Sequence, residues 1–441
     1  MMRRAIVATA LCILCSATAF QVRPGLQGSG WVRSVPTSSS SSASRPAPRG
    51  RSVEAPSMVL ITRNERVTST NNRVDTTIPN VDGAAVLETW QFKVLDYLFS
   101  IPLFNDALFG VYRKQQVKKA EGMGIKWTAF LDDLNRNKDR LLQIQDDMTD
   151  AALKIPEYYY APIHAYADGN LCWDSAMEED LWSKLVIAPL FNNSIHGDVC
   201  PMRRSKTPAF IDVYVRSLSC VVGFTCVLQE DLWSKLMIAP LFNNSIHGDV
   251  LMRRDWIDTC LKYKPQGEVK NVIDMGCGTG LSMYMVQTAW PQANLVGVDM
   301  STYKLAISQA KLEKKPEQQQ SKVTLRHAPA EETGEPSNKF DLATLCLVNH
   351  ESPEWVSKAM FKEANRILRP GGVFTILDLD KNNLAILLEN PFVAAVYKQT
   401  EPYMPEYMNL NINAAVEEAG FELLEVRNTS PSHIAIVARK L

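Results

Sequence analysis

The chain has 441 residues, 46% of them hydrophobic and 22% charged, which is a globular composition with room for two or three domains. Its 47 basic and 48 acidic side chains give a net charge of −1, so the composition offers no electrostatic argument for binding nucleic acid. No pair among the nine cysteines has metal-ligand spacing with histidine partners. We therefore expect free thiols in a reducing compartment and no metal site.

The N-terminal residues predict a targeting sequence. A basic start precedes an apolar run at residues 5–15 that is too short to span a bilayer comfortably, and Ala17–Ala19 offers a small-residue cleavage site. Residues 21–53 contain arginines and serines but no acid, which is typical of an unfolded transit peptide. We expect a signal peptide over 1–19 and a transit peptide with a linker over 20–83. With Phe20 at the junction, the pair resembles the presequences of algae whose plastids lie within extra membranes, and secretion is the alternative.

Residues 84–178 predict a helical cap region. Apolar and aromatic side chains recur at helical spacing from 86 to 99, and Pro102 interrupts the pattern. Three further amphipathic stretches follow at 103–117, 127–134 and 138–152. The apolar faces of the first two stretches suit packing against the rest of the chain, with peripheral contact to a membrane surface as the alternative.

Three glycines at alternate positions follow an apolar run that ends in Asp274. Gly276, Gly278 and Gly280 precede a helix-like stretch at 281–286, so we predict a strand, a tight turn and a helix N-terminus that a ligand approaches closely. The spacing is not that of the dinucleotide fingerprint. A carboxylate before the first glycine would repel a pyrophosphate but attract a ligand that carries an ammonium and a sulfonium.

Other segments predict the rest of an open α/β sheet. A second strand at 293–299 ends in Asp299, an acid that can accept both hydroxyls of a ribose. A later strand spans 340–347, and residues 366–376 read as a helix end, a turn and another strand. The alternating stretch 421–427 and the apolar stretch 433–439 predict a closing antiparallel hairpin.

Together these motifs resemble the class I S-adenosylmethionine (SAM)-dependent methyltransferases of the type 11-like group, over roughly residues 256–441. The resemblance implies a Rossmann-like α/β domain over 251–441 with SAM as its cofactor. It also implies that the cofactor is bound by residues of the glycine loop and the strand ends, which are Asp274, Gly276, Cys277, Gly278, Gly280, Asp299, Met300, Ala330, Cys346 and Leu347. Pro329 stands where the family usually has an acid for adenine, so adenine contact falls to backbone near Ala330 or to Glu331. We expect Cys277 to have a packing role.

Residues 156–174 are dense in polar and aromatic groups, which often converge in ligand pockets. The stretch resembles a His-Ala-Tyr-x-Asp-Gly-Asn-Leu-Cys-Trp signature of an uncharacterised cyanobacterial and plastid methyltransferase subgroup. In a functional interpretation four side chains cover the cofactor or position the acceptor: Tyr166, Asp168, Asn170 and Trp173. The alternative is a turn that aromatic side chains pack against the core.

Two more residues are candidates at the acceptor side. His350 follows the fourth strand and is a candidate general base, with a packed histidine at a helix start as the alternative. Tyr397 lies in an insertion at 390–403, where the family often builds its acceptor pocket.

Residues 179–199 recur at 230–250 with one change, Val186 to Met237. Such a close copy indicates a recent exon duplication or a gene-model artefact, not a structural repeat. We expect one copy to occupy the family position and give no catalytic role to His196 or His247.

We therefore expect a plastid SAM-dependent methyltransferase that acts on a small, apolar or aromatic acceptor and does not bind nucleic acid. The alternatives are a catalytically inactive SAM-binding assembly or regulatory protein and a protein methyltransferase.

Overall fold

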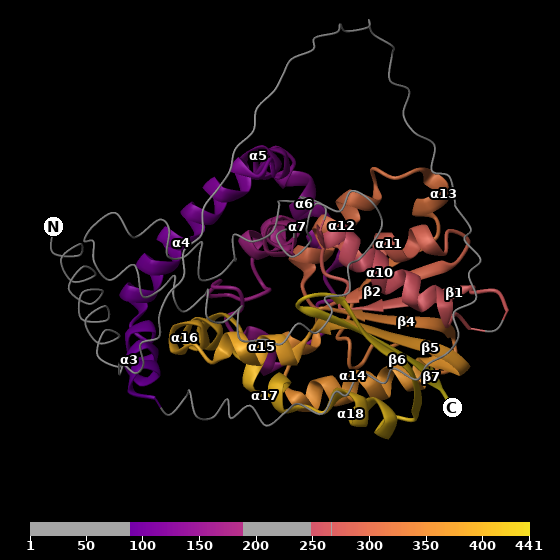
Figure 1. Ribbon diagram of the computed structural model, residues 1–441. Coiled ribbons are helices and arrows are strands. Elements are labelled where there is room, and N and C mark those ends of the chain that lie inside the picture. The colour runs from indigo at the N-terminus through magenta and orange to yellow at the C-terminus, as the bar shows by residue number, and fades with distance from the viewer. Residues whose placement is uncertain (1–88, 188–247, 266) are drawn as a thin grey trace, which may run out of the picture. The chain divides into compact units, whose positions relative to one another are not determined.

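The computed structural model describes residues 89–187, 248–265 and 267–441 (Figure 1). The expected signal and transit peptides and most of the duplicated segment, His196 and His247 included, lie outside the described residues. Among the described helices, none combines the length and the apolar character that a membrane crossing requires.

The described residues form a seven-stranded sheet in the order β3-β2-β1-β4-β5-β7-β6. β7 is antiparallel to both β5 and β6, and the other neighbouring strands are parallel. This confirms the predicted Rossmann-like sheet with a closing antiparallel hairpin. The strands are β1 (Asn271–Met275), β2 (Asn294–Asp299), β3 (Val323–His327), β4 (Phe340–Cys346), β5 (Leu368–Leu379), β6 (Phe421–Ser430) and β7 (His433–Lys440).

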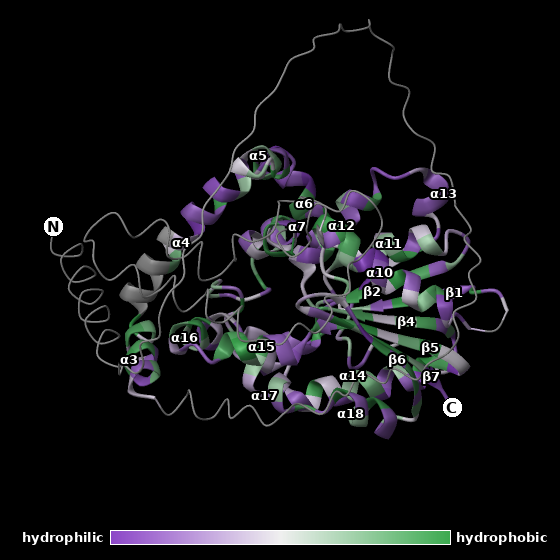
Figure 2. Ribbon diagram, viewed as in Figure 1, coloured by the Kyte–Doolittle hydropathy of each residue, from purple (hydrophilic) through white to green (hydrophobic). Residues whose placement is uncertain are grey.

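Helices cover both faces of the sheet, which is why the central strands are almost entirely apolar (Figures 1 and 2). One face packs on α14 (Glu354–Ile367), α17 (Met404–Asn409) and α18 (Ile412–Glu418), with Phe361, Phe374 and Phe421 in the core. The opposite face packs on α10 (Gly248–Lys262), α11 (Leu281–Ala289) and α12 (Thr302–Leu312). The shorter elements of this half of the chain are α13 (Glu317–Gln320), the 3₁₀ turn η3 (Asn349–Glu351), α15 (Lys381–Leu388) and α16 (Pro391–Thr400).

The predicted N-terminal helices are present and pack against the methyltransferase-like sheet domain at two places. The rings of Phe99 on α3 and Phe392 on α16 lie 6.1 Å apart, and Lys398 Nζ lies 2.8 Å from Asp96 Oδ2. At the other end α6 packs along α12. The helices are α3 (Trp90–Phe99), α4 (Pro102–Gly122), α5 (Trp127–Arg136), α6 (Lys138–Met148) and α7 (Trp173–Ile187), with the 3₁₀ turn η1 (Glu157–Tyr160) before α7.

The two copies of the duplicated segment contribute to different helices. α7 ends at Ile187 in the first copy, and α10 begins at Gly248 in the second. The helices contact one another, and Arg253 Nη1 donates to Ser183 Oγ over 3.1 Å. α7 therefore contains the start of the first copy, and α10 contains the end of the second copy.

We predict that deleting residues 188–238 preserves the fold. The deletion joins Ile187 to Ala239, which restores one continuous copy and leaves every described residue in place. The connection between α7 and α10 becomes less than a quarter of its present length. Each halving of a loop lowers the entropic cost of closing it by about 0.6 kcal/mol. The free energy of unfolding from urea titration should therefore equal or exceed that of the full chain. Loss of a cooperative transition would show that the deleted residues are structural.

Candidate functional site

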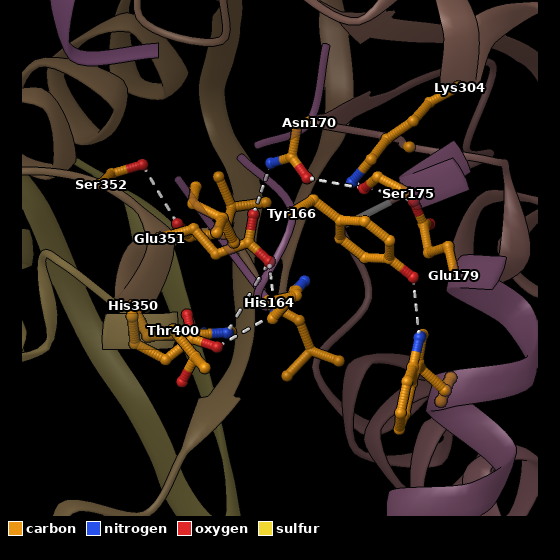
Figure 3. A pocket seen from close by; sticks show the side chains of 18 of the residues that line it. His164, Tyr166, Asn170, Ser175, Glu179, Lys304, His350, Glu351, Ser352 and Thr400 are labelled. Atoms are coloured by element: carbon orange, nitrogen blue, oxygen red, sulfur yellow. Dashed lines mark hydrogen bonds and ion pairs between the residues drawn. The ribbon is translucent and has the colours of Figure 1, made fainter. Parts of the chain in front are cut away.

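A cavity of about 900 Å³ lies at the carboxyl ends of the parallel strands. The loops after β1, β2 and β4 form one wall, and α4, α7, α16 and residues 158–170 form the others. Figure 3 shows labelled side chains from residues 164–170, α7, α16 and the segment after β4 gathered around the cavity. Open α/β sheets bind ligands at this edge, because the strand order reverses there and leaves a crevice.

The glycine loop after β1 is tied to the end of β2. The amides of Gly276 and Cys277 donate to Val298 O over 2.8 and 2.9 Å, and both Gly276 and Gly278 have positive φ. Burial and the charge of Asp299 raise the pKa of the Cys277 thiol well above its ordinary value. The thiol therefore stays protonated, which fits the expected packing role.

Asp274 is buried at the end of β1 and lines the cavity. Thr344 Oγ1 donates to its Oδ1 over 2.5 Å, while its Oδ2 is buried without a hydrogen-bond partner. Burial raises the pKa of this carboxyl to about 7, although the Thr344 bond acts in the other direction. An unpartnered carboxylate oxygen beside a cavity suits a cationic ligand.

Asp299, at the end of β2, connects three segments. Its Oδ2 accepts from the amide of Gly278 over 2.8 Å, and its Oδ1 accepts from the amide of Ser301 over 2.8 Å. The hydroxyl of Tyr159 also donates to Oδ1, over 3.3 Å. The Tyr159 hydroxyl therefore donates to the same carboxylate that is predicted to accept the hydroxyls of a ribose.

The structure brings most of the predicted site residues to this cavity. Lining it are Asp274, Gly276, Cys277, Gly278, Asp299, Met300, Ala330, Cys346, Leu347, Tyr166, Asp168, Asn170, Tyr397 and His350. Asn170 connects two strand ends, because its backbone oxygen accepts from Ser301 Oγ over 2.6 Å and its Nδ2 donates to Glu351 over 2.9 Å.

Two predicted residues are not among the side chains that line the cavity, so their roles in ligand binding stay predictions. Trp173 begins α7 and packs edge-to-face on Tyr303 of α12, with ring centroids 5.3 Å apart, outside the cavity-lining residues. Gly280 caps α11 with φ 82°, and a Cβ there would come within 2.5 Å of Ser308 Oγ. The turn therefore requires glycine at position 280.

His350 is buried beside Asp378. Its Nδ1 lies 2.6 Å from Asp378 Oδ1. Burial would lower the pKa of His350, but the Asp378 carboxylate outweighs it and raises the pKa to about 9. The imidazole is therefore protonated near neutral pH, so the general-base role stays a prediction that this pairing does not favour.

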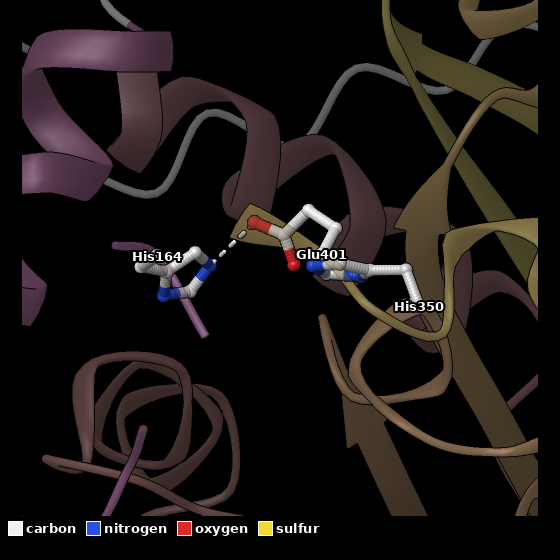
Figure 4. Close-up of side chains that lie close together, drawn as sticks. All are labelled: His164, His350 and Glu401. Atoms are coloured by element: carbon white, nitrogen blue, oxygen red, sulfur yellow. Dashed lines mark ion pairs between the residues drawn. The ribbon is translucent and has the colours of Figure 1, made fainter. Parts of the chain in front are cut away.

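The sequence analysis missed a second histidine and two acids next to His350. His164 Nε2 lies 3.4 Å from Glu351 Oε1 (Figure 3) and 3.2 Å from Glu401 Oε1 (Figure 4). His164 and Ala165 both have positive φ, 54° and 65°, which costs free energy for residues other than glycine. His164 lay inside the quoted signature, but nothing in the sequence shows which distant acids it meets.

Glu179 of α7 also escaped the sequence analysis. It accepts from the amide and the hydroxyl of Thr279 in the glycine loop, over 3.1 and 3.0 Å, and lies 2.9 Å from Lys304 Nζ. Burial alone would lower the pKa of Lys304, but the charges of Glu179 and Glu351 raise it. The ion pair holds α7 over the glycine loop.

The buried Asp274 predicts a pH-dependent stability. Between about pH 4 and pH 7 the unfolded chain loses the Asp274 proton while the folded chain keeps it, so the free energy of unfolding falls as pH rises. Asp274→Asn removes this loss and should stabilise the free protein by about 2–4 kcal/mol at about pH 8, and by much less at about pH 4. Urea unfolding at both pH values measures the difference. Exposed Asp147→Asn is the control, and equal pH slopes in the Asp274 variant and the wild type would contradict the assignment.

The position of Trp173 predicts a structural role. Trp173→Ala should lower the free energy of unfolding by about 1–3 kcal/mol, because it removes an aromatic pair between α7 and α12. Ligand affinity in the cavity should stay within twofold of the wild type in a calorimetric titration. Trp90→Ala, on the exposed side of α3, should cost less stability. A Trp173 variant that is stable but binds the ligand more weakly would show that Trp173 contributes to the binding site.

Comparisons with known proteins agree with the sheet and the glycine loop. Residues 272–372 match a family model described as a methyltransferase domain. Demethylmenaquinone methyltransferase of Listeria welshimeri serovar 6b is 28% identical over 130 residues, which are 29% of this chain and 53% of that protein. The enzyme of the same name from Geobacillus sp. (strain WCH70) is 25% identical over 130 residues, with the same two coverages. The chain thus spans about half the length of the curated relatives it matches.

Similar solved structures include phosphoethanolamine N-methyltransferase 2 of Haemonchus contortus in complex with SAM. It is 15% identical, with a TM-score of 0.34, and the match covers 42% of this chain and 52% of that one. A SAM-dependent methyltransferase from Aquifex aeolicus is 17% identical, with a TM-score of 0.33 and coverages of 42% and 90%. The family match begins in β1 and ends in β5, the strands that hold the glycine loop and both acids. Residues 272–372 of this chain therefore match a methyltransferase domain, and the sheet that contains them has the Rossmann-like class I methyltransferase fold.

Proposed function

We propose that the protein transfers a methyl group from SAM to a small, apolar or aromatic acceptor in a plastid. The proposal rests on one cavity that has room for both reactants. The part at Asp274 and Asp299 suits SAM, and the part beside His350 and Tyr397 suits the acceptor. The plastid location rests on the composition of residues 1–83 alone.

The residues at the first end fit SAM. The unpartnered Oδ2 of Asp274 suits the ammonium or the sulfonium, and Asp299 suits the ribose hydroxyls that would compete with Tyr159. Ala330 lines the wall expected for adenine, and Glu331 there already accepts from Tyr158 over 2.5 Å. A volume of about 900 Å³ lies near the upper end of the range of about 300–1,000 Å³ for small-molecule pockets, which leaves room for an acceptor.

Many of the side chains that line the cavity are apolar or aromatic. These include Phe109, Tyr112, Ile163, Val348, Met360, Val396, Tyr397 and Met404. Such a lining suits an apolar or aromatic ring, with a few polar groups to orient it. The similarity to demethylmenaquinone methyltransferases supports a ring of the quinone or phenol class.

Bound SAM supplies an electrophilic methyl group. The chain's own contribution is to hold the acceptor in line with that group and to exclude water, and good alignment is worth about 7–11 kcal/mol. The segment 158–170 serves both purposes. It covers the strand ends, and its Asn170 links Ser301 to Glu351. An acceptor that must lose a proton meets His164, His350, Glu351 and Glu401.

Isotopically labelled methyl-SAM tests the proposal directly. The full chain is incubated with labelled SAM and an apolar extract of algal plastids, and mass spectrometry follows the label. We expect the label in a small apolar or aromatic product and equimolar S-adenosylhomocysteine. Label only in polypeptides would replace the proposal with a protein methyltransferase, and SAM binding without turnover would replace it with a binding protein.

We predict that Asp299→Ala weakens SAM and S-adenosylhomocysteine equally, each by about tenfold or more, which is about 1.4 kcal/mol. Both ligands carry the ribose that Asp299 is expected to hold, and Asp299 also fixes the Gly278 amide of the glycine loop. Isothermal titration calorimetry measures the two affinities. Asp255→Asn is the control, since Asp255 pairs with Arg427 away from the cavity. A selective loss of SAM affinity would contradict the role of Asp299.

A further inference from the structure

Side chains from three distant segments form a cluster at the acceptor end of the cavity. One ligand atom each of His164, His350 and Glu401 lies within 4.8 Å of the other two (Figure 4). Glu351 adds a fourth group, with Oε1 3.4 Å from His164 Nε2 and 4.0 Å from His350 Nε2. Two imidazoles and one or two carboxylates are a common ligand set for divalent transition metals, including zinc and non-haem iron.

The surrounding residues orient this cluster as they do in metal sites. Asp378 lies 2.6 Å from His350 Nδ1, so Nε2 is directed at the cluster, where a metal ion would replace its proton. Metal-binding histidines usually donate their second ring nitrogen to a carboxylate in this way. Asn170 Nδ2 donates to Glu351 over 2.9 Å, and the amide of His164 donates to Thr400 O over 2.7 Å, beside Glu401.

Two further observations favour a ligand at this cluster. Glu401 is 7% exposed and lines the cavity, yet its Oε2 is buried without a hydrogen-bond partner. An unsatisfied buried carboxylate oxygen is costly unless something binds it. His164 and Ala165 are also held at positive φ, and strained backbone of this kind concentrates at functional sites.

We propose that His164, His350 and Glu401, with Glu351 as an additional carboxylate, bind a divalent first-row transition metal. The sequence analysis predicted no metal site, because spacing rules detect ligands within one segment and these come from residues 164, 350–351 and 401. The site lies beside Tyr397 and Met404, among the apolar side chains of the acceptor end.

The role of the metal rests on the proposed methyl transfer. An acceptor that carries a hydroxyl would bind the metal through its oxygen. Its O–H bond would then break, the proton would pass to bulk water, and the electron pair would stay on the acceptor oxygen. That pair forms the new bond to the methyl carbon. The S–CH₃ bond breaks, and its electrons return to sulfur, which leaves S-adenosylhomocysteine. No oxidant or reductant is required.

Cobalt(II) is the probe for the test. The full chain, with its affinity tag removed and stripped by a chelator, is titrated with Co²⁺ and followed by visible absorption, and Zn²⁺ then competes. We expect one equivalent to bind with the spectrum of nitrogen and oxygen ligands. His164→Ala and Glu401→Gln should each weaken binding by about 100-fold or more, and Asp378→Asn by about 10–100-fold.

His327→Gln is the matched control. His327 bonds to the backbone of Met300 and Asp150 and does not line the cavity, so this variant should keep wild-type metal affinity. Thermal midpoint and SAM affinity are measured for every variant, so that loss of folding is separated from loss of a ligand. Absence of stoichiometric Co²⁺ or Zn²⁺ binding, thiolate-to-cobalt charge transfer, or unchanged affinity in His164→Ala and Glu401→Gln would overturn the site and leave a hydrogen-bonded cluster.

The metal titration contains no SAM and no acceptor, so it can fail independently of the proposed function. Metal binding without methyl transfer would reject only the proposed reaction. Methyl transfer by protein that binds no metal would reject only the metal site.

Discussion

The carboxylate of Asp299 is the contact on which the arrangement of the site depends. It accepts from Gly278 in the loop after β1, from Ser301 at the start of α12 and from Tyr159 in the cap. A buried carboxylate is tolerated only when hydrogen bonds satisfy it, so these bonds must form together. Asp299 thus fixes the glycine loop and the cap relative to the same strand end, and the cavity exists because both are fixed there.

The cap itself is held by a second buried network. Glu178 accepts from the Tyr166 hydroxyl over 2.5 Å and pairs with Arg113, while Trp182 Nε1 donates to the same hydroxyl over 3.0 Å. These contacts connect α4, α7 and the 158–170 segment. Because a partly satisfied buried network is unfavourable, the three parts should close as a unit. A closed cap excludes water from the strand ends, and this is the environment that methyl transfer from a sulfonium needs.

The sequence predicted features that depend on local pattern. Apolar runs that end in Asp274 and Asp299, separated by a glycine loop and a helix, specify parallel strands, and the hairpin at 421–440 follows from residue patterning near the C-terminus. The position of Trp173 did not follow from sequence, because polar and aromatic density does not say which side of α7 faces the cavity. The cluster at His164 was missed for another reason. It requires two residues at positive φ and the convergence of three segments, and neither is a property of any single stretch.

Asn170 shows how the two ends of the cavity are coupled. Its backbone oxygen holds Ser301, whose amide bonds to Asp299, and its side chain holds Glu351, which faces His164. A ligand that displaces Tyr159 from Asp299 therefore acts on a segment that also positions the acceptor end. Asn170 is buried and both of its bonds cross between the cap and the sheet domain, so neither end can reorganise without straining the other. A cofactor whose ribose replaced Tyr159 on Asp299 would therefore act, through Ser301 and Asn170, on the segment that carries His164 and on Glu351.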